Sequence, residues 1–89
     1  MSNISKINYI VSKVFEIADD YNIDVLSDLS TNIATGKQEL VFNFRKNEKR
    51  VDTVIDVNDI YWIKDIDLIV KSLIEKMEEL KWKMRLILM

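Results

Sequence analysis

The ionisable side chains of this chain limit the chemistry that it could perform. The 89 residues include no His and no Cys, the side chains that most often transfer protons or attack substrates near neutral pH. Asp52 and Asp56 would share one face of a strand, but positions four apart at about 3.3 Å per residue stand roughly 13 Å from each other. That separation is too large for an acid–base pair of carboxylates, so we predict that the chain is not an enzyme.

Two further acidic pairs, Asp56 with Asp59 and Asp65 with Asp67, could approach a hard cation such as calcium or magnesium. Neither pair has the dense ligand spacing and central Gly of a calcium loop, and capping of a helix start explains Asp59 and Asp65 more simply. The Gly-Lys pair at 36–37 lacks the earlier Gly and the following Ser or Thr of a phosphate-binding loop, which predicts a hairpin turn there. We therefore expect no metal ion and no other cofactor.

One dense group of basic residues stands around a second predicted turn, with Glu48 inside it. A basic cluster of this kind could contact nucleic-acid phosphates or an acidic partner. The formal net charge of −2, however, gives the chain no overall attraction to nucleic acid. Solvated charge at a hairpin is our preferred interpretation, and nucleic-acid binding is the alternative function that stays open. The residues concerned are Arg45, Lys46, Lys49 and Arg50.

The C-terminal end of the chain carries the strongest indication of binding. Apolar residues from Ile66 to Ile87 recur at steps of four and three, which places them on one stripe of a long helix. From Trp82 onward a second stripe opens on a different side of the same helix. One stripe suffices for an internal core, so the second predicts an interface with another protein or with a further copy of the chain, as a homodimer or higher oligomer. We expect this interface to comprise Trp82, Met84, Leu86, Ile87 and Met89.

Two segments have the apolar spacing of amphipathic helices. The first covers residues 3–21, and Asn22 should end it because Asn tolerates the left-handed backbone conformation of a helix end. The second should begin at Asp65, after a short turn over residues 60–64, and continue to the C-terminus. A helix of about 25 residues would be roughly 37 Å long. It is longer than the strands, so its last turns should extend beyond the sheet.

Between the helices, alternation of apolar and polar residues predicts three strands over 25–33, 40–45 and 51–57. Short turns join them, which predicts a three-stranded antiparallel meander. The fold class is therefore α+β, and we expect both helices on one face of the sheet, since that arrangement buries every apolar face. The other face should stay in water, with Asp28, Ser30, Asn32, Asn43, Asp52 and Asp56 on it and Val41 and Val54 as small apolar exceptions.

Residues 1–89 should form a single α-β-β-β-α domain, because a chain this short cannot divide its buried surface between two cores. The lack of Cys favours an intracellular, cytoplasmic setting. The N-terminal segment lacks the uninterrupted apolar run of a signal peptide, and no apolar run approaches the ~20 residues that span a membrane. The basic residues near the C-terminus would also suit an anionic membrane surface, but the Glu residues just upstream would repel it.

The order helix, three-stranded sheet, helix resembles the layout of the double-stranded-RNA-binding domain. That family has a basic stretch at the start of its second helix, where this chain has Asp65, Ile66 and Asp67, so the resemblance is limited to the layout. In size, composition and topology the chain is similar to accessory proteins of phages that infect low-GC Gram-positive bacteria. That similarity implies a non-enzymatic protein that binds and modulates a host protein by occupying its surface.

Overall fold

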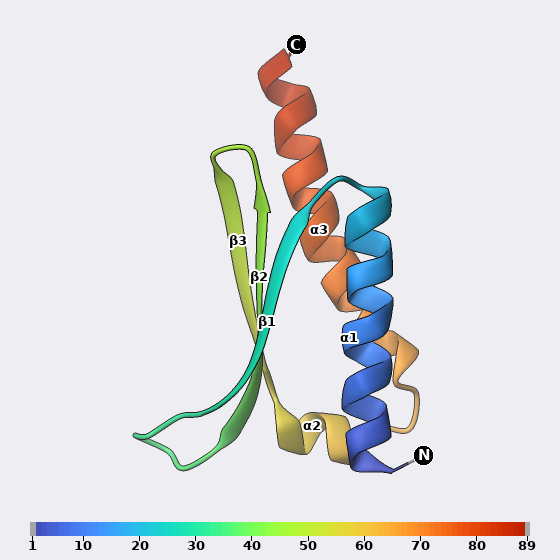
Figure 1. The fold of residues 1–89 in the computed structure, drawn as a ribbon, viewed down its shortest axis with the longest axis vertical. Coiled ribbons are helices and arrows are strands. Elements are labelled where there is room, and N and C mark those ends of the chain that lie inside the picture. The colour runs from blue at the N-terminus through green and yellow to red at the C-terminus, as the bar shows by residue number, and fades with distance from the viewer. Residues whose placement is uncertain (1, 89) are drawn as a thin grey trace.

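The computed structural model describes the backbone of residues 2–88 and the side chains of residues 2–80. The elements are, in order, α1 (Asn3–Asp20), β1 (Asp24–Thr31), β2 (Gln38–Lys46), β3 (Lys49–Asp56), α2 (Val57–Trp62) and α3 (Asp67–Leu88). This order confirms the predicted α+β class. Figure 1 shows α1 and α3 next to each other on one face of the sheet, as expected, and no helix of the described chain over the other face.

The sheet is an antiparallel meander in which β2 lies between β1 and β3. Three side chains of β2, Leu40, Phe42 and Phe44, face the helices and are at most 1 % exposed. The register places Phe42 between Ser27 of β1 and Thr53 of β3, and its ring stacks on that of Phe44 with 5.9 Å between the ring centroids. The central strand thus supplies the sheet side of a core in which all described buried side chains are hydrophobic.

Helix α1 has one buried face and a capped start. Ile10, Val14 and Ala18 follow one another at intervals of four and are at most 1 % exposed, which is the spacing that keeps side chains on one face of a helix. Ser2 caps the first turn, because its hydroxyl oxygen accepts a hydrogen bond from the Ser5 amide at 3.1 Å. The amphipathic pattern of the sequence is therefore confirmed, and it directs α1 onto the sheet.

The C-terminal end of α1 adopts the conformation that the sequence predicts. Asn22 has a left-handed backbone with φ of 55°, and the Ile23 amide donates a hydrogen bond to the Ala18 carbonyl at 2.9 Å. Ile23 itself is buried in the core. This is a Schellman ending, in which the residue after the turn folds back onto the last helical turn.

The short helix α2 differs from the sequence prediction, which places a turn over residues 60–64. Val57 and Ile60 are 2 % and 0 % exposed, and a helical turn directs these two positions, three apart, toward the same core. The Asp56 carboxylate accepts a hydrogen bond from the Asn58 amide at 2.9 Å and caps the helix. The burial of two apolar side chains and this cap explain why helix replaces turn immediately after β3.

Helix α3 completes the core and then continues beyond the sheet. It begins at Asp67, where the amide donates to the Asp65 carboxylate at 3.1 Å, so Asp65 lies before the helix and caps its first turn. The predicted stripe is confirmed where side chains are described, because Val70, Leu73, Met77 and Leu80 are at most 6 % exposed. Figure 1 shows the last turns of α3 beyond the connection between β2 and β3, as the predicted length requires.

Candidate functional site

The face of the sheet that the helices leave uncovered has an apolar centre. Register places Val41 and Val54 directly opposite each other on this open face, with Asp28 on the other side of Val41. Leu26 stands diagonally next to Val41 across the same pair of strands. Leu26 is 66 % exposed and Val54 53 %, so apolar side chains face water here. We call Leu26, Val41 and Val54 the apolar centre.

Charged side chains surround the apolar centre. The carboxylates that strand alternation places on the open face are Asp24, Asp28, Glu39, Asp52 and Asp56, and the strand cations there are Arg45 and Arg50. The carboxylates outnumber the cations, so the open face carries a net negative charge at neutral pH. We call these five carboxylates the acidic rim.

Asp52 accepts hydrogen bonds from two polar side chains next to the apolar centre. Arg50 Nε and the Asn43 side-chain amide both donate hydrogen bonds to Oδ1 of Asp52, at 3.0 and 2.5 Å. The hydrogen bond to Asp52 and the attraction of its negative charge raise the pKa of the Arg50 guanidinium above its ordinary value. Asn43 is also the cross-strand partner of Leu26. At the border of the apolar centre, Asn43, Arg50 and Asp52 therefore form one connected polar group.

The structure divides the predicted basic cluster between the two faces of its hairpin. Arg45 and Arg50 are cross-strand partners on the open face, whereas Lys46 and Lys49 are partners on the face that bears the helices. Lys46 Nζ donates a hydrogen bond to the Tyr21 carbonyl at 2.9 Å. This contact places a cation at the C-terminal end of α1, where the helix carbonyls concentrate negative charge. The four predicted cations therefore do not form a single basic surface.

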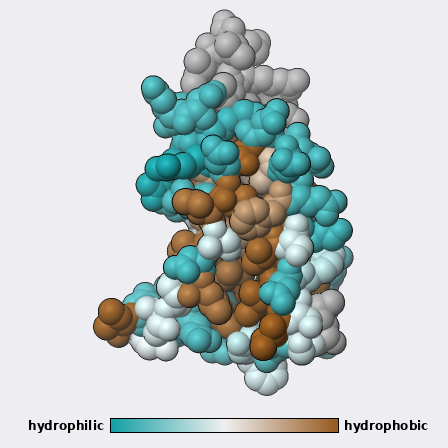
Figure 2. Space-filling view, viewed as in Figure 1, coloured by the Kyte–Doolittle hydropathy of each residue, from teal (hydrophilic) through white to brown (hydrophobic). Residues whose placement is uncertain are grey.

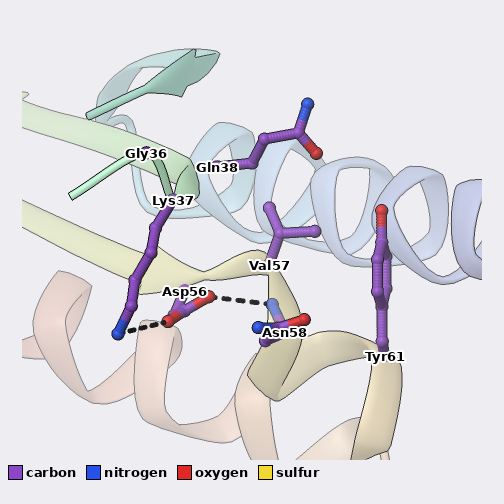
Figure 3. Close-up of a pocket in the computed structure, with 7 residues that line it drawn as sticks. All are labelled: Gly36, Lys37, Gln38, Asp56, Val57, Asn58 and Tyr61. Atoms are coloured by element: carbon purple, nitrogen blue, oxygen red, sulfur yellow. Dashed lines mark hydrogen bonds and ion pairs between the residues drawn. The ribbon is translucent and has the colours of Figure 1, made fainter. Parts of the chain in front are cut away.

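A shallow depression lies where the connection between β1 and β2 approaches α2 (Figure 3). Its volume is about 240 Å³, and it is lined by Gly36, Lys37, Gln38, Asp56, Val57, Asn58 and Tyr61. One oxygen of Asp56 is 3.6 Å from Lys37 Nζ, and the other accepts the Asn58 amide. Asp56 therefore pairs with Lys37 and caps α2, both structural roles. Gly36 has a φ of 73°, in agreement with the turn predicted for the Gly-Lys pair.

Of the acidic residues considered from the sequence, Asp56 caps α2, whereas Asp59, expected to cap a helix start, lies inside the first turn of α2 and is not its cap. Asp65 and Asp67 have contacts within the fold. Asp65 accepts the Asp67 amide at the start of α3, and the Tyr9 hydroxyl donates to Oδ1 of Asp67 at 2.7 Å. The second of these bonds connects α1 to α3. In the described residues, no three His, Cys, Asp or Glu side chains are grouped closely enough to hold a metal ion.

Leu26 and Trp62 are among the exposed hydrophobic residues that the sequence prediction does not identify. Leu26 belongs to the apolar centre, and the alternation that directs Val25 toward the helices could have identified it as outward-facing. Trp62 is 83 % exposed at the end of α2, and its place depends on a helix that the sequence pattern does not reveal. It borders a second hollow of about 340 Å³ together with Asn3, Asn58 and Tyr61.

The predicted C-terminal interface falls on the last turns of α3. The backbone is helical through Leu88. The side chains of the predicted interface residues Trp82, Met84, Leu86, Ile87 and Met89 lie outside the part of the chain that the structure describes. This interface therefore stays a prediction from sequence periodicity.

Within the described residues, none of the helices combines the length and the apolar character needed to cross a membrane. The chain was compared with protein-family models, with curated proteins and with solved structures, and none of them matches it.

Proposed function

We propose that this chain is a small, non-enzymatic protein-interaction module that binds another protein through the open face of its sheet. The observation that carries the proposal is the apolar centre, in which Leu26 and Val54 remain 66 % and 53 % exposed inside an acidic rim. An apolar centre within a polar rim is the common anatomy of protein interfaces. Burial of these side chains against a partner would remove apolar surface from water and so favour association.

The acidic rim favours a partner whose apolar patch is bordered by basic residues. Complementary charges speed the encounter of two surfaces and disfavour partners of the wrong charge. Asp28 is next to Val41, and Asp52 is next to Asn43 across the strands, so carboxylates flank the apolar centre on both sides. The similarity to phage accessory proteins favours a host protein as this partner, modulated when its surface is occupied.

The C-terminal helix would supply a second contact. Trp82, Leu86 and Met89 follow one another at steps of four and three, and Trp and Met are enriched at interface centres. In this proposal the open face recognises the partner, and the end of α3 either extends that contact or joins two copies of the chain.

The proposal can be tested by capturing partners from a low-GC Gram-positive bacterial lysate with tagged wild-type protein and variants. The open-face variant is Leu26→Ser with Val54→Ser, and the matched control is Ile33→Ser, because Ile33 is 98 % exposed in the connection after β1 and lies outside the open face. We expect the open-face variant to lose the captured protein while the control retains it, with unchanged unfolding transitions in both. With the purified partner, the open-face variant should weaken Kd at least tenfold, about 1.4 kcal/mol.

A third variant separates the two proposed contacts. Substitution of Trp82, Leu86 and Met89 together by Ser should leave the fold intact and remove any contact made by the end of α3. Loss of the partner in this variant, with full retention in the open-face variant, would contradict recognition by the open face. Capture that disappears after nuclease treatment and weakens steeply with salt would instead support the nucleic-acid alternative at Arg45 and Arg50.

A further inference from the structure

The outer edge of β1 is the less protected edge of the sheet. In the described sheet, β1 is paired with β2 alone and β3 likewise has β2 as its single neighbour. Half of the residues of β3 are charged, namely Lys49, Arg50, Asp52 and Asp56, whereas β1 contains only Asp24 and Asp28 and has neither Lys nor Pro. Charged residues, Lys above all, and Pro are the usual protection of an edge against pairing with another strand. The edge of β1 is therefore the one able to accept a further strand.

The neighbouring flank of α1 is also partly exposed and apolar. The Tyr9 hydroxyl bonds to Asp67 of α3, so the flank that bears Tyr9 faces α3. Ile4, Val11 and Phe15 lie on the opposite flank, spaced seven and four apart. Ile4 is 73 % and Phe15 41 % exposed, while Val11 is partly buried.

The edge of β1 and this flank of α1 form one continuous surface. Leu29 points to the helix-bearing side of β1, opposite Leu40, and is nevertheless 50 % exposed. Figure 1 shows β1 and α1 on the side of the molecule that faces the viewer, and Figure 2 shows hydrophobic residues gathered between the sheet and this helix in the same view. We call Ile4, Val11, Phe15 and Leu29, together with the free edge of β1, the β1–α1 edge.

We propose that the β1–α1 edge binds a second copy of this chain, through antiparallel pairing of the two β1 strands across a two-fold axis. The two three-stranded sheets would join into one six-stranded sheet. This inference does not depend on the proposed function of the open face, and it involves a different surface from the predicted contact of the C-terminal helix.

The sequence of β1 selects one register for this pairing. If the helices of both copies lie on the same side of the joined sheet, each residue of β1 must be opposite a residue of the same face in the other copy. The two longest registers that meet this condition are centred on Ser27 and on Asp28. The register centred on Asp28 places that carboxylate against its own copy, which is unfavourable. The register centred on Ser27 sets Val25 against Leu29 and Leu26 against Asp28, with no carboxylate opposite another. In the register centred on Ser27, two copies of β1 therefore match each other: apolar Val25 and Leu29 are paired, and no two negative charges are opposite each other.

The same symmetry operation would cover the flank of α1. A two-fold axis perpendicular to the sheet at Ser27 brings the two α1 helices together on one side, antiparallel, with the flanks that bear Ile4, Val11 and Phe15 toward each other. The edge groups of β1 gain hydrogen-bond partners, and the exposed surface of Phe15 and Leu29 is removed from water. This single arrangement would therefore pair the free edge of β1 and cover the exposed flank of α1.

A cysteine cross-link tests this register, because the chain contains no Cys and a single introduced thiol is unique. Ser27→Cys would face its own copy across the axis, within the range of a disulfide. Ser30→Cys is the matched control, since in this register it would be roughly 20 Å from its copy along the strands. We expect mild oxidation to convert Ser27→Cys into a covalent dimer on a non-reducing gel while Ser30→Cys stays largely monomeric, and light scattering to give the mass of a dimer for the wild type.

A helix variant provides an independent test that needs no oxidation. Phe15→Glu should weaken the dimer roughly tenfold or more by placing a charge in the helix contact, whereas Ile33→Ser should leave it unchanged. A wild-type protein that stays monomeric at high concentration would overturn the proposal. A dimer in which Ser30→Cys cross-links as fast as Ser27→Cys, or in which Phe15→Glu has no effect, would overturn it as well, because association would then use another surface.

Discussion

Phe42 occupies the middle of the central strand and is fully buried. Its cross-strand neighbours, Ser27 and Thr53, are small, so they cannot fill the space that its removal would leave. We expect Phe42→Ala to lower the free energy of unfolding by about 3–5 kcal/mol, and Leu73→Ala by about 2–5 kcal/mol. Urea denaturation with an unchanged m-value measures this difference. Leu68→Ala is the control, since Leu68 is 58 % exposed on the same helix as Leu73, and a loss below about 0.5 kcal/mol for Phe42→Ala would show that the core is elsewhere.

Asn22 provides a test of backbone conformation. Its left-handed φ of 55° costs most residues with a Cβ about 1 kcal/mol or more, whereas Gly adopts it freely. We therefore expect Asn22→Gly to change the free energy of unfolding by a few tenths of a kcal/mol and Asn22→Ala to lower it by about 1 kcal/mol. Thermal or urea unfolding distinguishes the two variants. Because Ala forms helices better than Gly, a more stable Ala variant would mean that α1 continues past this position.

The contact between Tyr9 and Asp67 predicts a specific pH dependence. The hydrogen bond to Asp67, with smaller contributions from partial burial and from the negative charges of Asp67 and Asp65, raises the pKa of Tyr9 above its ordinary value of 10.0. The folded state therefore holds this proton more tightly than the unfolded state does, so the contribution of the bond to stability is present below about pH 10 and is lost as the pH rises through the pKa of folded Tyr9.

Tyrosinate absorbance during an alkaline titration measures this effect. Asp67→Asn should move the titration of one tyrosine to lower pH, because the charge and the acceptor of the bond are weakened. Asp59→Asn serves as a control, because it removes the same charge from a residue that does not shift the pKa of Tyr9. Identical titration curves for the wild type and for Asp67→Asn would contradict the contact.

For the helices and strands, the periodicity of apolar residues predicted the structure wherever a segment was long enough for the pattern to repeat. The pattern over residues 3–21 predicted α1 and its end, and alternation over 40–45 predicted which side chains of β2 face the core. The six residues of α2 are too few for a helical period to be recognised. The start of that helix depends on the Asp56 carboxylate and on the burial of Ile60, which are properties of the folded chain.

The candidate site was predicted only in part from the sequence. Val41 and Val54 were assigned to the uncovered face, but the place of Leu26, diagonally next to Val41, depends on the register between β1 and β2. The basic cluster looks continuous along the sequence, yet a tight hairpin directs Arg45 and Arg50 to one face and Lys46 and Lys49 to the other. The closeness of these four residues in the sequence therefore suggested a larger basic surface than the structure has. Alternation along the strands shows why, because it directs neighbouring residues to opposite faces.

The proposed open-face interface and the proposed pairing at the β1–α1 edge are compatible in one assembly. Pairing at the β1–α1 edge uses the free edge of β1 and one flank of α1. It leaves the apolar centres of both copies uncovered on the same side of the joined sheet. Such an assembly would present two equivalent binding faces to one partner or to a symmetric pair of partners. Two linked contacts hold a partner more tightly than either contact alone, provided that both can be engaged together.

The position of α3 after the sheet also determines the order in which the protein can be completed during synthesis. The strands leave the ribosome before α3. The core-facing side chains of β2, Leu40, Phe42 and Phe44, are therefore not covered by Leu73 and Met77 until α3 has been synthesised. In that interval a nascent chain exposes an aromatic strand surface and an open β1 edge simultaneously, the two features that promote misassembly with neighbouring chains. Rapid translation of the α3 segment, or temporary shielding by a chaperone, would therefore favour the yield of folded protein.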